Sequence, residues 1–197
     1  MIVSLPYRPT QCLGPLLIAL LAILGFLFSP YSNDWFAYDR YAIEGFETWR
    51  LISGNIVHTN GFHLLLNLAG LILLWALHGD HYRIGLFLKL FVWCCLGTSL
   101  GIYFFSPSLI WYAGLSGALH GVFIWGACMD IRMGIKSGWL LLAGIVFKLG
   151  MEQWQGSSAE LAELIDANVA VDAHLYGAIS GLALFLVMWA LSRPAQK

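Results

Sequence analysis

The feature that most constrains this chain is a series of long apolar runs along almost its whole length. A run of about 20 apolar residues is long enough to cross the roughly 30 Å of hydrocarbon in a bilayer. Six such runs occur, near residues 11–29, 61–78, 85–105, 114–130, 138–155 and 171–192. The sequence therefore predicts a single all-α polytopic membrane domain over residues 1–197, with six transmembrane helices and no separate soluble domain.

Composition excludes most soluble functions. Hydrophobic residues make up 59% of the chain and charged residues only 11%, whereas soluble domains have about 45–50% apolar and about 25% charged residues. The formal net charge of −1 provides no clustered basic surface of the kind that nucleic acids require. We therefore expect membrane lipids and membrane-embedded proteins as partners, and no nucleic acid.

The positions of Lys and Arg predict the orientation. With six spans, the two termini and the second–third and fourth–fifth connections lie on one side of the membrane. The basic residues of that side are Arg8, Arg83, Arg132, Lys136, Arg193 and Lys197. The other side has only Arg40 and Arg50. Because basic residues are enriched on the cytoplasmic side, both termini are predicted to be cytoplasmic.

The connection between the first and second runs, residues 30–60, is long for a compact bundle and rich in aromatic residues. Long ordered loops tend to carry function, and aromatic side chains favour the membrane interface. We expect an ordered loop at the non-cytoplasmic surface. A flexible connector is the alternative.

Polar side chains open three of the six runs. The second run begins with His58, His63 and Asn67, the fourth with Ser116, and the sixth with His174. In the predicted topology these three runs enter the membrane from the same side, so the side chains lie at a similar depth. Polar groups within a membrane are costly and usually functional. We therefore expect them to converge on one site.

The residue types in this cluster are those of a serine hydrolase. Ser116 alone is a poor nucleophile, but His174 within hydrogen-bond reach can accept its proton and later deliver it to a leaving amine. Such a dyad works without a carboxylate. The backbone N–H of Ser116, the Asn67 amide and the His63 ring are candidate donors to the tetrahedral oxyanion.

Small residues would let the two reacting helices approach each other. Gly117 and Gly121 in the fourth run, and Gly177 and Gly181 in the sixth, form two G-x-x-x-G faces. Such faces permit close backbone contact between membrane helices. A Ser–His hydrogen bond between helices needs this proximity.

Each motif also has a structural interpretation. Ser beside Gly is often a packing residue, and a His–Asn pair can be a helix-packing hydrogen bond. Zinc is the main chemical alternative, with imidazoles from His58, His63, His120 and His174. The chain has no H-E-x-x-H motif and no acidic or Cys ligand set near these residues except Asp172. We therefore expect no metal and no cofactor.

On these motifs the chain resembles the rhomboid family of intramembrane serine proteases over nearly its whole length. The matching motifs are Trp49-Arg50, His58-x4-His63-x3-Asn67, Gly114-Leu115-Ser116-Gly117 and His174-x2-Gly177-x3-Gly181. The resemblance implies a six-helix rhomboid fold, a Ser116–His174 dyad and an oxyanion site that uses His63 and Asn67. It also implies lateral access of the substrate near the second and fifth helices.

One position departs from many rhomboids, which have Tyr one turn after the nucleophile where this chain has His120. With the minimal six-helix length, this is similar to the rhombosortase branch. That resemblance implies a bacterial inner-membrane enzyme with its active site towards the periplasm. It would cleave the GlyGly-CTERM tail of exported proteins, which comprises a Gly-rich motif, one hydrophobic helix and a basic end. Hydrolysis and transfer to an amine both stay open.

Two interpretations of His120 follow: a ring that stacks on His174 and orients it, which we prefer, or a second titrating group that shuttles protons. Three alternatives to the overall function also stay open. They are a general rhomboid protease, a non-catalytic rhomboid-like protein that binds client helices, and a small transporter. The non-catalytic alternative is disfavoured because both Ser116 and His174 are present, and the transporter because the inner halves of the second and fourth runs are almost wholly apolar.

Overall fold

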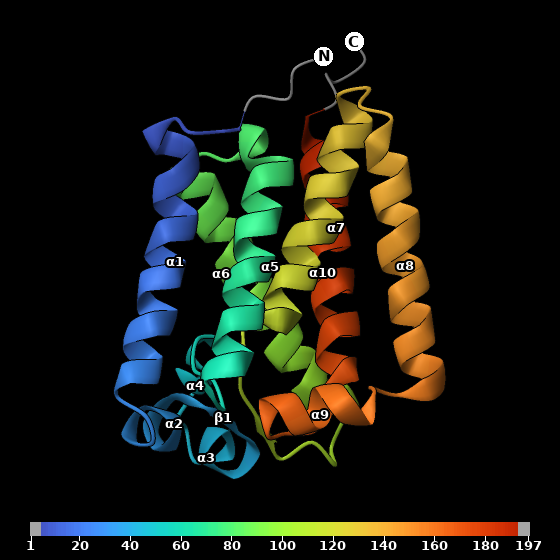
Figure 1. The fold of residues 1–197 in the computed structure, drawn as a ribbon. Helices are drawn as coiled ribbons and strands as arrows, with labels where there is room; N and C mark the ends of the chain where they lie inside the picture. The colour runs from blue at the N-terminus through green and yellow to red at the C-terminus, as the bar shows by residue number, and fades with distance from the viewer. Residues whose placement is uncertain (1–4, 193–197) are drawn as a thin grey trace.

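The structure, a computed structural model, describes residues 5–192 as a bundle of long helices with short elements at one end (Figure 1). The long helices among these residues are α1 (Pro9–Leu27), α5 (Gly61–His78), α6 (Ile84–Phe105), α7 (Ser116–Arg132), α8 (Ser137–Gln155) and α10 (Val171–Leu191). One of them covers each predicted run, and no helix end differs from the predicted bound by more than two residues. The apolar runs therefore located the helices well.

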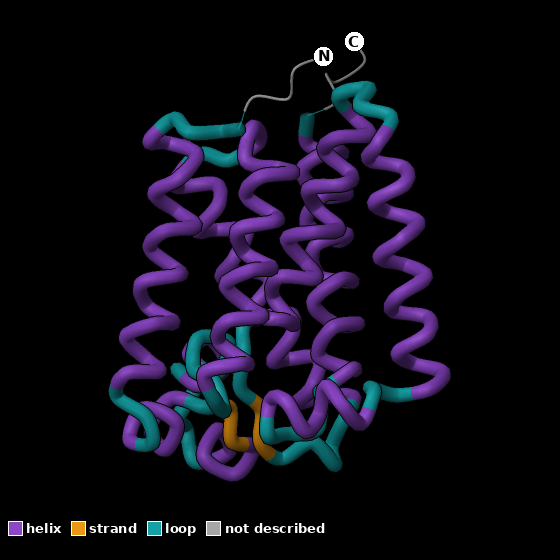
Figure 2. Tube along the Cα trace, viewed as in Figure 1, coloured by secondary structure: helices purple, strands orange, loops and turns teal. Residues whose placement is uncertain are grey.

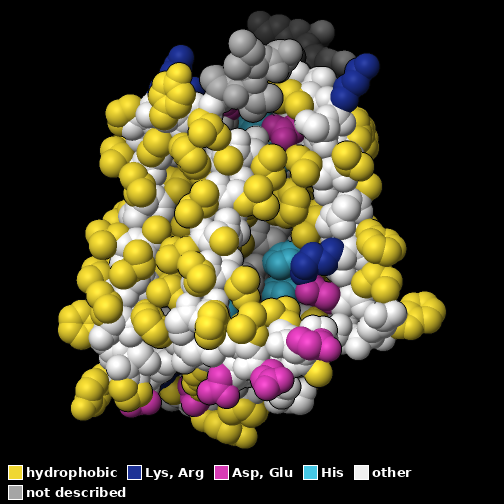
Figure 3. Space-filling model, viewed as in Figure 1, with side chains coloured by type: hydrophobic (Ala, Val, Ile, Leu, Met, Phe, Trp, Pro, Cys, Tyr) yellow, Lys and Arg dark blue, Asp and Glu magenta, His cyan; other side chains and the backbone are white. Residues whose placement is uncertain are grey.

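Within residues 5–192, four helices are long and apolar enough to cross a membrane: α1, α5 with its extension to His81, α6 and α10. Of the other two, α7 has 17 residues, and α8 carries Lys148 and Glu152. The structure thus supports a multi-pass membrane protein, and the count of six spans stays a prediction. Hydrophobic side chains cover the flank of the bundle that Figure 3 shows.

Helix α7 lies at the centre, in contact with α5, α6, α8 and α10. Its closest partner is α10, since a Cβ atom at Gly177 would collide with the carbonyl oxygen of Gly117, and one at Gly181 with that of Gly121. Because the obstructing atoms are backbone atoms, no rotamer change could relieve either collision. The two G-x-x-x-G faces therefore pack against each other.

The 30–60 connection is ordered, and it packs beneath the bundle in Figure 1. It contains α2 (Tyr31–Phe36), β1 (Tyr38–Asp39), α3 (Arg40–Glu44) and α4 (Arg50–Ser53). Strand β1 pairs antiparallel with β2 (Trp111–Tyr112), with Tyr38 opposite Tyr112 (Figure 2, orange). The pairing attaches this connection to the segment that leads into α7. The 3-10 helix η1 (Gly79–His81) and helix α9 (Ala159–Ile165) complete the described elements.

The Trp49-Arg50 motif holds this connection together. The buried Arg50 guanidinium donates to the carbonyl oxygens of Asp34 at 2.8 Å and Ala37 at 2.9 Å. The Trp49 indole N–H donates to the carbonyl oxygen of Trp35 at 3.1 Å. These bonds satisfy backbone carbonyls that have no strand or helix partner. The connection is thus a folded cap, and the flexible connector is the wrong alternative.

Candidate active site

Ser116 is the first residue of α7, and the turn before it is built around a tyrosine hydroxyl. The Tyr112 hydroxyl donates to the carbonyl oxygen of Gly114 at 2.7 Å, and the Tyr112 Oη accepts from the Gly117 N–H at 3.3 Å. Gly114 has φ +122°, a backbone conformation that residues other than glycine rarely adopt. This turn fixes the position of Ser116 against α10.

The Ser116 side chain meets His174 across the α7–α10 contact. Its Oγ lies 2.9 Å from the His174 Nε2. His174 belongs to the first turn of α10 and is 6% exposed. The two residues lie 58 positions apart in sequence, so this contact is a product of the fold. The 2.9 Å distance between the two atoms is the hydrogen-bond distance that a nucleophile and its general base require.

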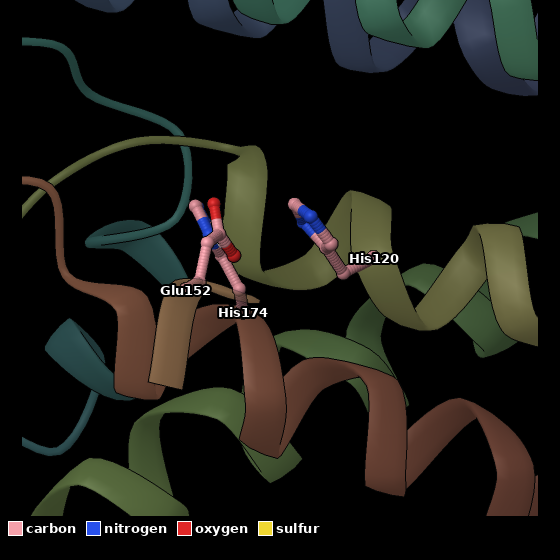
Figure 4. A group of neighbouring side chains, drawn as sticks. All are labelled: His120, Glu152 and His174. Atoms are coloured by element: carbon pink, nitrogen blue, oxygen red, sulfur yellow. The ribbon is translucent and has the colours of Figure 1, made fainter. Parts of the chain in front are cut away.

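The other ring nitrogen of His174, Nδ1, contacts Glu152, a residue that the sequence did not single out. The His174 Nδ1 lies 2.9 Å from the Glu152 Oε2, and Glu152 comes from α8. Figure 4 shows His174 and Glu152 side by side, with His120 beside them, each from a different helix. A carboxylate inside the mostly apolar 138–155 run, four residues after Lys148 and near the same end as the other polar residues, was the available signal.

His120 stacks on His174, with ring centroids 4.1 Å apart and an interplanar angle of 17°. Its Nδ1 donates to the Ser116 carbonyl oxygen at 2.7 Å, since a carbonyl can only accept. The neutral ring then has a free lone pair on Nε2, which accepts from the Lys148 Nζ at 3.1 Å. Both nitrogens are thus engaged, and this geometry favours the stacking interpretation over the proton shuttle.

The spacing of His120, Glu152 and His174 would also suit a metal ion, because their ligand atoms lie within 4.8 Å of one another. The Lys148 ammonium competes for the same atoms. It donates to the Glu152 Oε1 at 2.5 Å as well as to His120. An ion could bind only by displacing this resident positive charge. We therefore interpret the three side chains as part of a hydrogen-bonded network.

The candidate oxyanion donors lie on α5 and at the start of α7. The Asn67 Nδ2 donates one hydrogen to the His63 carbonyl oxygen at 3.0 Å, which leaves its second hydrogen free. The Ser116 backbone N–H has no acceptor among residues 5–192. Because Ser116, Asn67 and His63 line the same cavity, both groups can donate to an oxyanion as they stand.

The third candidate donor, His63, is arranged differently. The Thr59 hydroxyl donates to the Ile165 carbonyl oxygen at 2.5 Å and lies 2.9 Å from the His63 Nδ1. Since the hydroxyl has a single hydrogen, it accepts from Nδ1–H, and the neutral His63 has no hydrogen on Nε2. Its Nε2 faces Gly114. His63 can therefore stabilise an oxyanion only after it binds a second proton or changes tautomer.

The His58 ring packs against the His63 ring. The His58 ring is fully buried and meets the His63 ring edge-on, with centroids 5.1 Å apart. Neither ring nitrogen has a partner among residues 5–192. Burial, together with the neighbouring His63, lowers the pKa of His58 to about 3. His58 is therefore neutral at physiological pH and holds the His63 ring by packing.

The reactive groups open into two cavities. The first, of about 350 Å³, is lined by His63, Asn67, Ser116, His120, Lys148 and His174 together with apolar side chains of α5, α7 and α9. In Figure 3 it is the hollow between α5 and α8 in which histidine, lysine and acidic side chains are visible. The second, of about 230 Å³, is lined by residues of the 109–113 and 165–170 segments. Because Ser116 borders both, it is accessible from two directions.

Helix α9 covers this end of the site. The Asn60 Nδ2 donates to the Leu164 carbonyl oxygen at 2.9 Å, and Thr59 donates to that of Ile165. These bonds tie the end of α9 to the residues that precede α5. Helix α9 therefore narrows the loop side of the site to the second cavity, while the first cavity opens through the flank between α5 and α8.

Comparison with protein families agrees with this geometry. The model of the rhomboid domain matches residues 45–191, a range that contains every candidate site residue. A search of curated proteins finds no match. Since the matched range spans most of the chain, the chain belongs to the rhomboid family of intramembrane serine proteases.

Proposed function

We propose that Ser116 and His174 are the catalytic nucleophile and general base of this protease. The observation that carries the proposal is the 2.9 Å contact between the Ser116 Oγ and the His174 Nε2. The hydroxyl transfers its proton to Nε2 as Oγ attacks the scissile carbonyl carbon. The imidazolium then protonates the leaving amine as the C–N bond breaks, which leaves an acyl-enzyme on Ser116.

The oxyanion of each tetrahedral intermediate lies, in this proposal, between Asn67 and the start of α7. The free hydrogen of the Asn67 amide and the Ser116 N–H are the donors available at rest. Removing one such donor typically lowers kcat about 10²–10³-fold. His63 adds a third donor once it is protonated on Nε2.

The proposed topology has six membrane spans, both termini in the cytoplasm and the site towards the periplasm of a bacterial inner membrane. The distribution of basic residues supports it. Arg83, Arg132 and Lys136 lie at the end of the bundle where α1 begins. At the other end, Arg40 and Arg50 are buried and bonded to backbone carbonyls. Their guanidinium groups are thus bonded within the protein, and Arg50 also pairs with Glu47 at 2.6 Å.

The proposed substrates are exported proteins with a C-terminal GlyGly-CTERM tail, as in rhombosortases. His120 supports this because it replaces the usual tyrosine and stacks on His174. The first cavity supports it as well, since it opens sideways between α5 and α8 towards the lipid, where the helix of such a tail would lie. Glycines weaken that helix and let an extended backbone reach Ser116. The acyl-enzyme is then resolved by water or by an amine.

The test is to express an exported reporter with a GlyGly-CTERM tail beside the wild type and the Ser116→Ala variant. The new C-terminus of the product is then determined by intact mass. The proposal predicts cleavage at the Gly-rich motif with the wild type alone, and an added mass would identify transfer to an amine. Ser116-dependent cleavage of other transmembrane substrates, with this tail intact, would leave a general rhomboid protease. No Ser116-dependent cleavage of any substrate would favour the non-catalytic client-binding protein.

A further inference from the structure

Glu152 is the one carboxylate in direct contact with the proposed dyad within residues 5–192. Both of its oxygens are engaged, Oε2 with the His174 Nδ1 at 2.9 Å and Oε1 with the Lys148 Nζ at 2.5 Å. The side chain is 14% exposed. Placing a carboxylate at this depth is costly, so these contacts need an explanation beyond helix packing.

The contacts of Glu152 fix the tautomer of His174. An ionised carboxylate can only accept hydrogen bonds, so the hydrogen of the neutral imidazole lies on Nδ1. The lone pair is then on Nε2, which faces the Ser116 Oγ at 2.9 Å. The Ser116 hydroxyl therefore donates to His174, as a nucleophile must if the base is to remove its proton.

Resting on the proposed function, we infer that Glu152 is the positioning carboxylate of a Ser116–His174–Glu152 triad in place of the dyad expected from the sequence. Glu152 holds the His174 ring in the reactive tautomer and orientation. It also stabilises the imidazolium that forms when Ser116 attacks. It does not touch the reacting atoms and accepts no proton itself.

Lys148 completes the arrangement by compensating the carboxylate charge. Its ammonium donates to Glu152 and to the His120 Nε2, and the His120 Nδ1 donates in turn to the Ser116 carbonyl oxygen. The hydrogen bonds therefore form a closed ring that leaves Ser116 at its hydroxyl and returns at its carbonyl group. In a low-dielectric site, a paired charge is far less costly than an isolated one.

An ion pair between Glu152 in α8 and His174 in α10 that only stabilised the fold would have the same contacts. The Glu152→Gln variant separates this structural role from the positioning role. In this variant Lys148 donates to the amide oxygen of the new side chain, so the amide NH₂ group of that side chain faces the His174 Nδ1. The amide NH₂ group can only donate, so the imidazole hydrogen moves to Nε2. Nε2 can then no longer accept the Ser116 proton. The comparable change in a serine-protease triad lowers kcat about 10⁴-fold.

The experiment measures kcat and KM for a transmembrane reporter in proteoliposomes, together with the rate at which a fluorophosphonate labels Ser116. Glu152→Gln is expected to lower kcat and the labelling rate by about 10³–10⁴-fold while KM changes less than about threefold. Glu152→Asp keeps the carboxylate and is expected to recover at least about tenfold of the lost kcat. The matched control, Glu163→Gln on the exposed face of α9, should leave both constants unchanged.

Two outcomes would overturn the inference. Wild-type kcat in Glu152→Gln, with Ser116→Ala still inactive, would remove Glu152 from the mechanism and leave the dyad. A loss of kcat, substrate binding and thermal stability together, with no recovery in Glu152→Asp, would make Glu152 structural. Cleavage by Ser116→Ala would instead refute the proposed function itself, so the two failures are distinguishable.

Discussion

Gly114→Ala should lower activity more than stability, because Gly114 lies between the turn before Ser116, the proposed nucleophile, and His63 and Asn67, proposed to stabilise the oxyanion. A Cβ atom at this position would lie 2.6 Å from the Nε2 and 2.7 Å from the Cε1 of His63. To reach ordinary van der Waals contact, the His63 ring or the turn must move by roughly 0.8 Å. Because α5 carries both His63 and Asn67, that shift alters the geometry of the oxyanion donors.

Gly114→Ala should have two effects, one on the reaction rate and one on the stability of the fold. A misplacement of about 1 Å at a reacting centre can lower the rate about 10²-fold. The φ of +122° at Gly114 adds a conformational strain of about 1–3 kcal/mol, which lowers the free energy of unfolding. We therefore expect kcat to fall about 100-fold, with a smaller change in KM.

Two control variants separate the effect on the reaction rate from the effect on stability. Gly134 also has a positive φ, +78°, but its Cβ would meet nothing within 4 Å, so Gly134→Ala should lower stability and leave kcat unchanged. Gly144 in α8 has ordinary helical φ and equally open space, so Gly144→Ala should leave kcat unchanged and raise stability by about 0.5–1 kcal/mol. Cleavage kinetics in proteoliposomes and thermal unfolding in detergent measure both quantities. Wild-type kcat in Gly114→Ala would refute this account of the turn.

Three further perturbations give distinct results. Gly181→Ala places a methyl group against the Gly121 backbone and should lower the free energy of unfolding by about 1–3 kcal/mol, measured by thermal unfolding; an unchanged midpoint would contradict the α7–α10 contact. Asn67→Ala should lower kcat about 10²–10³-fold with little change in KM, whereas equal loss in binding would make Asn67 structural. Because the folded-state pKa of His58 is about 3 against an ordinary value of 6.5, the unfolded chain takes up the proton first as pH falls. The contribution of His58 to the free energy of unfolding should thus be constant well above pH 6.5 and decline below it by up to about 1.4 kcal/mol per pH unit, and His58→Phe should remove this component; identical pH profiles would contradict it.

The helices were predictable because the hydrocarbon thickness of a bilayer sets their length. Each apolar run gave helix ends within two residues of the observed ones. The close approach of Ser116 to His174 followed from glycine spacing and from three polar helix starts on one side. These signals are local in sequence, and they depend on requirements that every membrane helix must meet.

The contacts of Glu152 were not predictable in this way. Its link to His174 depends on the rotation of α8 about its axis, and no periodic pattern reports that rotation in a helix whose residues are mostly not buried. The β1–β2 pairing was missed for a related reason, because strands of two residues are too short to show an alternating pattern. An acid four residues after a lysine in a mostly apolar run was the one signal for Glu152.

We propose that the fold makes Ser116 an activated nucleophile, and locating a covalent adduct tests this most directly. The folded wild-type protein in membranes would be treated with a fluorophosphonate, digested and examined by mass spectrometry. We expect one adduct, on the peptide that contains Ser116, and its loss in the His174→Ala variant. An active protein that carries the adduct on another serine, or that labels Ser116 equally well without His174, would contradict it.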